Sequence, residues 1–231
     1  IMLFGISLIY GTTGSIFYAD MMGKMQMNEL QLVALAFFLG GMAFKISLVP
    51  FHFWTADVYE GAPTNVAAYL SVISKGASAF VLIVLLFSVF KEMFEAWEII
   101  IYAMAILTMT VGNLFALRQQ NIQRFMAFSS IAQAGFILLG VISGTQYGMT
   151  TVVYFILVYV FSNLGAFGVV SIVNNATGKL NIDDYKGFYQ TNPKLSLVML
   201  LSLFSLAGIP PVAGFFGKFF LFAAAAEQGY Y

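Results

Sequence analysis

The sequence contains no cysteine, a single histidine and few charged residues. Charged side chains make up 9% of the 231 residues, against about 25% in typical globular proteins, so too little polar surface is available to face water. Without cysteine the chain cannot hold an iron–sulfur cluster or a cysteine-based zinc site, and one histidine cannot supply both axial ligands of a haem. We therefore expect that it carries no electrons itself. Its ten acidic and ten basic residues cancel, and no basic cluster points to nucleic acid.

Hydrophobic residues make up 61% of the chain, and the mean hydropathy is +0.90. Runs of about 20 apolar residues can cross a hydrocarbon core of roughly 30 Å. Because these runs are too long and continuous for the strands of a membrane barrel, they predict transmembrane helices. The predicted fold is an all-α membrane protein, a polytopic transmembrane helix bundle. Its seven segments lie near residues 1–18, 30–54, 64–90, 97–117, 122–143, 149–173 and 195–226.

The ends and loops of the chain predict its place in the membrane. The first apolar run lacks the positive start and the small-residue cleavage site of a signal peptide, so we expect the chain to begin in the middle of a longer protein. One side of the membrane receives two basic loop residues and the other receives five, which makes the second side cytoplasmic by the positive-inside rule. The first side has Lys24 and Lys91; the second has Arg118, Arg124, Lys179, Lys186 and Lys194.

Besides the connection near Arg118 and Arg124, two connections lie on the predicted cytoplasmic side. Residues 57–63 are expected to form a loop after the second apolar segment. Residues 174–194 form the longest connection and hold Asp183, Asp184 and Lys186. We interpret this connection as a solvated surface loop, with docking of a neighbouring subunit as the alternative.

Three lysines, Lys45, Lys75 and Lys218, lie inside apolar segments. A charged lysine at the bilayer centre costs roughly 2.5–3.5 kcal/mol, so such residues usually mark a proton or ion pathway. At about 1.5 Å per residue, Lys45 lies about 22 Å and about 14 Å from the ends of its segment, and Lys75 about 16 Å and about 22 Å. Neither therefore reaches water easily by extending its side chain, which is the alternative explanation. Lys218 lies about eight residues, or roughly 12 Å, from the end of its run, so its depth argues less strongly.

No carboxylate of this chain is expected beside these lysines, because all ten Asp and Glu residues lie in loops or at segment ends. The lysines are then either partly neutral or paired with residues outside the chain. Burial lowers the pKa of a lysine, which brings the amine closer to the range where it can take up and release a proton. We therefore predict that Lys45, Lys75 and Lys218 form a proton relay.

Proline interrupts two of the predicted helices. Pro50 follows Lys45, and Pro210 and Pro211 precede Lys218. Proline removes a backbone donor and clashes with the preceding turn, so each helix should unwind locally and line protein or a wet cavity; a kink that serves only packing is the alternative. The two broken helices are five segments apart, an odd offset that is typical of inverted repeats in transporters.

Other polar residues near the lysines have two interpretations each. His52 lies at the predicted cytoplasmic end of the second segment and ionises near neutral pH, so it is a candidate point for protons to enter; an interfacial side chain is the alternative. Small polar residues in two other segments can hold water or serve helix packing, and we favour packing for most of them. They are Ser71, Ser74, Ser78, Ser129, Ser130 and Gln133. No glycine-rich nucleotide motif and no metal-spaced cluster is present.

Four stretches of the sequence resemble one known family. They are FKISLVPFHFWTADVYEGAPTNVAAYLSVISKGASAF (44–80), NIQRFMAFSSIAQAGFILLG (121–140), FSNLGAFGVV (161–170) and SLAGIPPVAGFFGKFFLF (205–222). On these residues the chain resembles the antiporter-like, proton-translocating membrane subunits of respiratory complex I. Within that family it is most similar to the subunit N branch of NADH:quinone oxidoreductase, the counterpart of mitochondrial subunit 2. The similarity runs over essentially the whole chain, and the block at residues 50–64 is highly specific.

The resemblance implies an inverted-repeat antiporter-like fold of fourteen helices, of which this chain would cover roughly helices six to twelve. Residues 1–91 would end the first inverted repeat, and residues 92–231 would form most of the second, within a single membrane domain. The resemblance also implies a multi-pass protein of the bacterial inner (plasma) membrane. Its partners would be neighbouring membrane subunits of complex I and the lipid bilayer.

The resemblance also assigns roles to the three lysines. Lys45 is similar to the lysine on the broken seventh helix of the family, whose glutamate partner on helix five would lie before Ile1. Lys75 is similar to the connecting residue on helix eight, and Lys218 to the terminal residue on broken helix twelve.

Two positions depart from the family pattern. Gln133 stands where many members have histidine, and Ala56 stands where proline is common. We therefore expect no titrating role at position 133. The resemblance implies that flavin, iron–sulfur clusters and quinone, together with the NADH chemistry, belong to other subunits and that this chain holds no cofactor.

Three functions fit these residues. The first is proton translocation as a subunit of NADH:quinone oxidoreductase, in which protonating one lysine favours release from the next, because like charges in a low-dielectric interior cannot all be ionised cheaply. The second is a subunit of a multisubunit cation/proton antiporter or of a membrane-bound hydrogenase. The third is a structural membrane scaffold whose lysines carry no protons. We favour the first.

Overall fold

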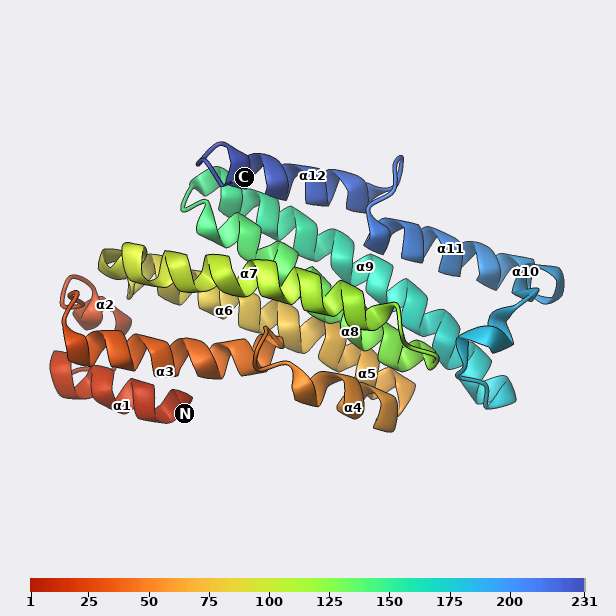
Figure 1. The fold of residues 1–231 in the computed structure, drawn as a ribbon, viewed down its shortest axis with the longest axis horizontal. Coiled ribbons are helices and arrows are strands. Elements are labelled where there is room, and N and C mark those ends of the chain that lie inside the picture. The colour runs from red at the N-terminus through yellow and green to blue at the C-terminus, as the bar shows by residue number, and fades with distance from the viewer. Residues whose placement is uncertain (231) are drawn as a thin grey trace.

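The computed structural model describes residues 1–230, which form a bundle of helices aligned along one long axis (Figure 1). Five helical stretches are long and apolar enough to cross a membrane. The predicted all-helical, multi-pass membrane fold is confirmed. The helices are α1 (Met2–Thr13), α2 (Tyr18–Met21), α3 (Glu29–Ile46), α4 (Phe53–Gly61), α5 (Thr64–Tyr69), α6 (Lys75–Ser88), α7 (Phe94–Ala116), α8 (Ile122–Ile142), α9 (Gln146–Thr177), α10 (Phe188–Thr191), α11 (Pro193–Ala207) and α12 (Ala213–Ala226).

Helix α8 is the centre of the bundle. It packs against α4, α6, α7, α9 and α12, and most of its residues are buried, whereas the other spanning helices expose a large part of their surface. Glycine brings α7 close to it: a Cβ atom on Gly112 would lie 2.7 Å from the backbone nitrogen of Ala132. Small residues at such contacts are typical of membrane helices. The outer surface carries many large apolar side chains, as expected for contact with lipid or neighbouring helices.

Both helices that proline was predicted to interrupt are broken. Residues 47–52 separate α3 from α4, and residues 208–212 separate α11 from α12. Each upstream helix ends on a left-handed residue, Ser47 with φ 69° and Gly208 with φ 80°. Such a residue turns the chain away from the helix axis and lets the following N–H groups bond to the last carbonyls.

The prediction that residues 57–63 form a loop was wrong. Helix α4 continues the second membrane segment to Gly61, beyond the break. The polar residues Asp57 and Glu60 suggested a loop, but a helix carries such residues on one face. The same helix buries Thr55 and Tyr59 on another face.

The connection at residues 174–194 is more ordered than predicted. Most of its residues are exposed, but 182–185 and 188–191 form short helical turns. An isolated antiparallel bridge pairs Asn181 with Asn121, so the connection is tied to the chain just before α8.

The basic loop residues lie at the two ends of the bundle, as predicted. Lys24 and Lys91 lie in the connections before α3 and α7, at the left in Figure 1. The connections between α7 and α8 and between α9 and α11 lie at the right and hold Arg118, Lys179 and Lys186. Arg124 and Lys194 lie in the first turns of α8 and α11, which follow these connections. Successive connections lie at opposite ends because each membrane-crossing segment takes the chain from one end of the bundle to the other.

Candidate functional site

Lys75 is buried in the middle of the bundle, with 3% of its surface exposed. Its Nζ donates a hydrogen bond of 2.8 Å to Ser130 Oγ on α8 and lies 5.7 Å from the centre of the Tyr59 ring on α4. It takes part in none of the salt bridges within residues 1–230. The ammonium group therefore has neutral partners only.

Hydroxyl and amide groups surround this lysine. The hydroxyls of Ser71 and Tyr159 are 2.9 Å apart, and Asn163 Nδ2 donates to Ser71 Oγ at 2.9 Å. The Tyr59 hydroxyl is buried and forms no hydrogen bond within the described chain. These side chains come from four different parts of the chain. We call this group the Lys75 cluster: Tyr59, Ser71, Lys75, Ser130, Tyr159 and Asn163.

A π-helical turn at Leu70–Ser74 leads directly into Lys75. It joins α5 to α6 within one membrane-crossing helix, and it buries Ser71 in the same cluster as Lys75. Such turns are rare and occur often at functional sites. The sequence did not predict this turn, because residues 70–74 contain neither proline nor glycine.

Lys218 lies at the second break. Its Nζ donates to the backbone oxygens of Leu206 at 2.7 Å and Ala207 at 3.2 Å, and it lies 4.3 Å from the centre of the Phe136 ring. These carbonyls are free for the lysine because α11 ends at Ala207, and the C-terminal end of a helix favours a cation. Glycine makes the approach feasible: a Cβ atom on Gly208 would lie 2.9 Å from Lys218 Cδ.

Helix α8 contacts both lysine sites. Gln133 Nε2 donates at 2.9 Å to the Leu206 oxygen, which also accepts from Lys218. Ser130, which bonds to Lys75, lies one turn earlier on the same helix. Our preference for a pure packing role at these two positions missed these contacts. Only the rotation of α8 in the bundle reveals them, and the sequence does not specify that rotation.

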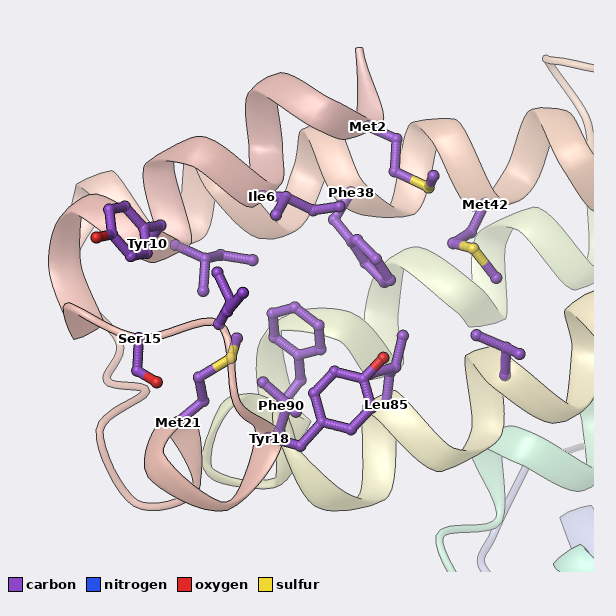
Figure 2. A pocket seen from close by; sticks show the side chains of 14 residues that line it. Met2, Ile6, Tyr10, Ser15, Tyr18, Met21, Phe38, Met42, Leu85 and Phe90 are labelled. Carbon is purple, nitrogen blue, oxygen red and sulfur yellow. The ribbon is translucent and has the colours of Figure 1, made fainter.

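An open cavity of about 610 Å³ adjoins Lys218. Its lining is mainly apolar but includes the polar side chains of Asn113, Ser129 and Gln133. A second cavity of about 350 Å³ lies between α1, α2, α3 and α6 (Figure 2). No lysine, histidine or carboxylate lines that second cavity, so we do not assign it to the same site.

The other two candidate residues, Lys45 and His52, lie in different surroundings from Lys75 and Lys218. Lys45 is exposed on the last turn of α3 and takes part in none of the salt bridges of the described chain. His52 is buried at the start of α4, with its ring centre 4.5 Å from that of Phe53. Because α4 continues to Gly61, the predicted position of His52 at the end of the segment was wrong.

Arg124 joins α8 to α4 at the end of the bundle. Its Nη1 lies 2.6 Å from a carboxylate oxygen of Asp57 and 2.6 Å from one of Glu60. Both carboxylates are exposed, with 72% and 40% of their side-chain surface accessible. The acidic residues of α4 are thus neutralised at the end of the helix rather than beside a lysine.

Comparison with known proteins places this arrangement in a family. The family described as "NADH:quinone oxidoreductase/Mrp antiporter, TM" matches residues 1–231. The chain belongs to this family. The resemblance found in the sequence to antiporter-like membrane subunits is therefore confirmed.

Individual relatives agree with this membership. The chain is 56% identical to NADH-quinone oxidoreductase subunit N of Phocaeicola vulgatus, over 100% of this chain and 49% of that protein. A chain of respiratory complex I from Thermus thermophilus is 35% identical with a TM-score of 0.79, over 99% of this chain and 49% of that one. A chain of the Mrp complex from Dietzia sp. is 27% identical with a TM-score of 0.91, over 99% and 42%. The chain thus spans about half the length of these relatives.

Proposed function

We propose that the chain is part of subunit N of NADH:quinone oxidoreductase and moves protons across the membrane with energy from electron transfer in other subunits. The observation that carries this proposal is the series of polar contacts from Lys75 through α8 to Lys218. Ser130 accepts from Lys75, and Gln133 shares the Leu206 oxygen with Lys218. Both amines lie within apolar helices and have neutral partners.

Neutral partners leave each lysine able to lose its proton. A neighbouring carboxylate would hold the ammonium charged, whereas a hydroxyl or a carbonyl offers only a hydrogen bond. Moving an ammonium group from water into protein costs several kcal/mol, so the neutral amine becomes accessible. A charge on one lysine further raises the cost of charging the other, since the interior screens poorly. A change at one site is therefore passed to the next.

Lys45 and His52 complete the proposed path. Lys45 would be a further proton carrier, and its exposed amine leaves it free to meet a partner outside this chain. His52 would receive protons at the first break, where its buried ring lies. NADH, flavin, iron–sulfur clusters and quinone would belong to other subunits, and neighbouring membrane subunits would be the partners.

A cation/proton antiporter is the second candidate. The TM-score of 0.91 to a chain of the Mrp complex favours it, although the identity to that chain is 27% against 56% to the subunit N relative. Neighbouring genes for flavin and iron–sulfur subunits would support the first candidate. Proton movement that requires added sodium would support the second.

The test replaces Lys75 or Lys218 by alanine in the intact complex. We expect several-fold weaker NADH-driven proton uptake by inverted membrane vesicles, since each change removes one carrier. NADH:ferricyanide activity reports the amount of assembled complex. The control is Lys186→Ala, because 78% of the Lys186 side-chain surface is accessible and its partner is the equally exposed Asp183. Undiminished proton uptake in both relay variants would contradict the proposal.

A further inference from the structure

Four buried polar atoms near the first break have no hydrogen-bond partner in the described chain. They are Ser47 Oγ, His52 Nδ1, Thr55 Oγ1 and Tyr59 OH. Thr55 and Tyr59 are both fully buried, with 0% of their surface exposed. An unsatisfied buried polar group costs about 1–3 kcal/mol, so a series of them does not serve stability.

Three of these residues share one face of α4. His52, Thr55 and Tyr59 are three and four residues apart, the spacing of neighbours on a helix surface. Because α4 packs on α8, this buried face is directed into the bundle. Thr55 and Tyr59 are four residues apart, which places them about one turn from each other on the helix.

This face ends at the Lys75 cluster. Lys75 Nζ lies 5.7 Å from the centre of the Tyr59 ring and 2.8 Å from Ser130 Oγ. At its other end is His52, in the break after α3. The unpartnered atoms therefore lie between the first break and the buried Lys75. No other titratable side chain of α4 is buried there.

We propose that the hydroxyls of Thr55 and Tyr59 carry protons between the break at His52 and Lys75. This inference rests on the proposed proton translocation and assigns one link of it. Each hydroxyl oxygen forms an O–H bond with a proton arriving from bridging water on the His52 side and breaks its original O–H bond on the Lys75 side. The released proton reaches the neutral Lys75 amine through Ser130 or water, so each hydroxyl ends uncharged as it began.

A packing role for Tyr59 predicts a different behaviour. The ring alone would fill the space, and phenylalanine would then be at least as stable, because it removes an unpartnered hydroxyl. Tyr159 shows how a structural hydroxyl in the same cluster behaves: it bonds to the Ser71 hydroxyl at 2.9 Å and to the Ser71 carbonyl at 3.0 Å. The Tyr59 hydroxyl has no such bonds.

The test uses Tyr59→Phe and Thr55→Val in the intact complex, since both changes remove a hydroxyl and keep the shape. We expect several-fold weaker NADH-driven proton uptake, with an unchanged or higher thermal midpoint and unchanged NADH:ferricyanide activity. Thr55→Ser should restore proton uptake, because it returns the hydroxyl. Tyr69→Phe is the matched control, as Tyr69 is 54% exposed on α5.

Lys75→Ala, measured alongside, separates the two proposals. If it abolishes proton uptake while Tyr59→Phe and Thr55→Val behave as the parent, the hydroxyl path is wrong and proton translocation stands. If Tyr59→Phe lowers the thermal midpoint and Thr55→Ser fails to restore uptake, the role of these residues is structural and the path is also wrong. Undiminished uptake in Lys75→Ala contradicts the proposed function itself.

Discussion

Ser47 has an unfavourable conformation at the first break. Its φ of 69° is the only positive value at a non-glycine residue within the described chain. Left-handed backbone at such a residue costs of the order of 1–3 kcal/mol, and the buried Oγ atom gains no hydrogen bond in return. At the second break, glycine occupies the same position with φ 80° and avoids this cost. The residue that ends the upstream helix is therefore strained at the first break and not at the second.

We expect Ser47→Gly to stabilise the protein by about 1 kcal/mol, because glycine adopts positive φ without a clash. Ser47→Val should destabilise it, since a β-branched side chain fits this conformation worse. The measurement is the thermal inactivation midpoint of the purified complex. Ser88→Gly, on helix α6, is the control and should destabilise, because glycine is unfavourable inside a helix. Equal shifts for both glycine variants would argue against strain at Ser47.

Helices in this bundle approach each other through glycine on α7 and α8. Added side-chain volume at Gly112 would meet the backbone of Ala132, which cannot move without shifting α8. Gly168 on α9 is exposed and has no atom within 4 Å of where its Cβ would lie. The same substitution therefore has opposite consequences at the two sites.

Gly112→Ala should lower the thermal midpoint of the complex and weaken its proton uptake, because α8 carries contacts to the buried Lys75 and the half-buried Lys218. Gly168→Ala should leave proton uptake unchanged and stabilise the helix by about 0.5–1 kcal/mol. Thermal unfolding and NADH-driven uptake of the two variants, compared with the parent, provide the measurement. A destabilised Gly168→Ala together with a neutral Gly112→Ala would refute this account of the packing.

Sequence patterns predicted the elements better than their mutual contacts. Long apolar runs and proline determine local structure, so the membrane segments and both breaks were predicted. The helix at Phe53–Gly61 and the π-helical turn at Leu70–Ser74 were missed, because burial on α4 and a change of helical pitch depend on neighbouring helices. In the candidate site the lysines were recognisable as charges in apolar runs. Their partners Ser130 and Leu206 were not, since they come from other helices.

The two ends of the bundle differ in their number of basic residues. Two basic residues lie at one end and five at the other, which predicts that the second end faces the cytoplasm. The division into inverted repeats near residue 91 stays a prediction. The orientation itself can be tested directly, because the chain has no cysteine that would interfere with labelling.

Single cysteines at exposed Lys91 and Lys186 should react with a membrane-impermeant maleimide from opposite sides. Lys186→Cys should be labelled in inverted vesicles and Lys91→Cys in right-side-out vesicles, since an even number of crossings would be needed to bring them to the same side. Labelling after detergent treatment is the control for reactivity. Labelling of both from one side would overturn the predicted topology.

The burial of α8 has a consequence for how the sequence can change over evolutionary time. A helix that borders lipid can exchange one apolar residue for another of different size, because lipid chains adapt to either. Helix α8 borders other helices on nearly all sides, so a larger or smaller side chain there requires a compensating change in a neighbour. Its residues should therefore diverge in step with those of α7, α9 and α12, and more slowly than the lipid-facing positions of those helices.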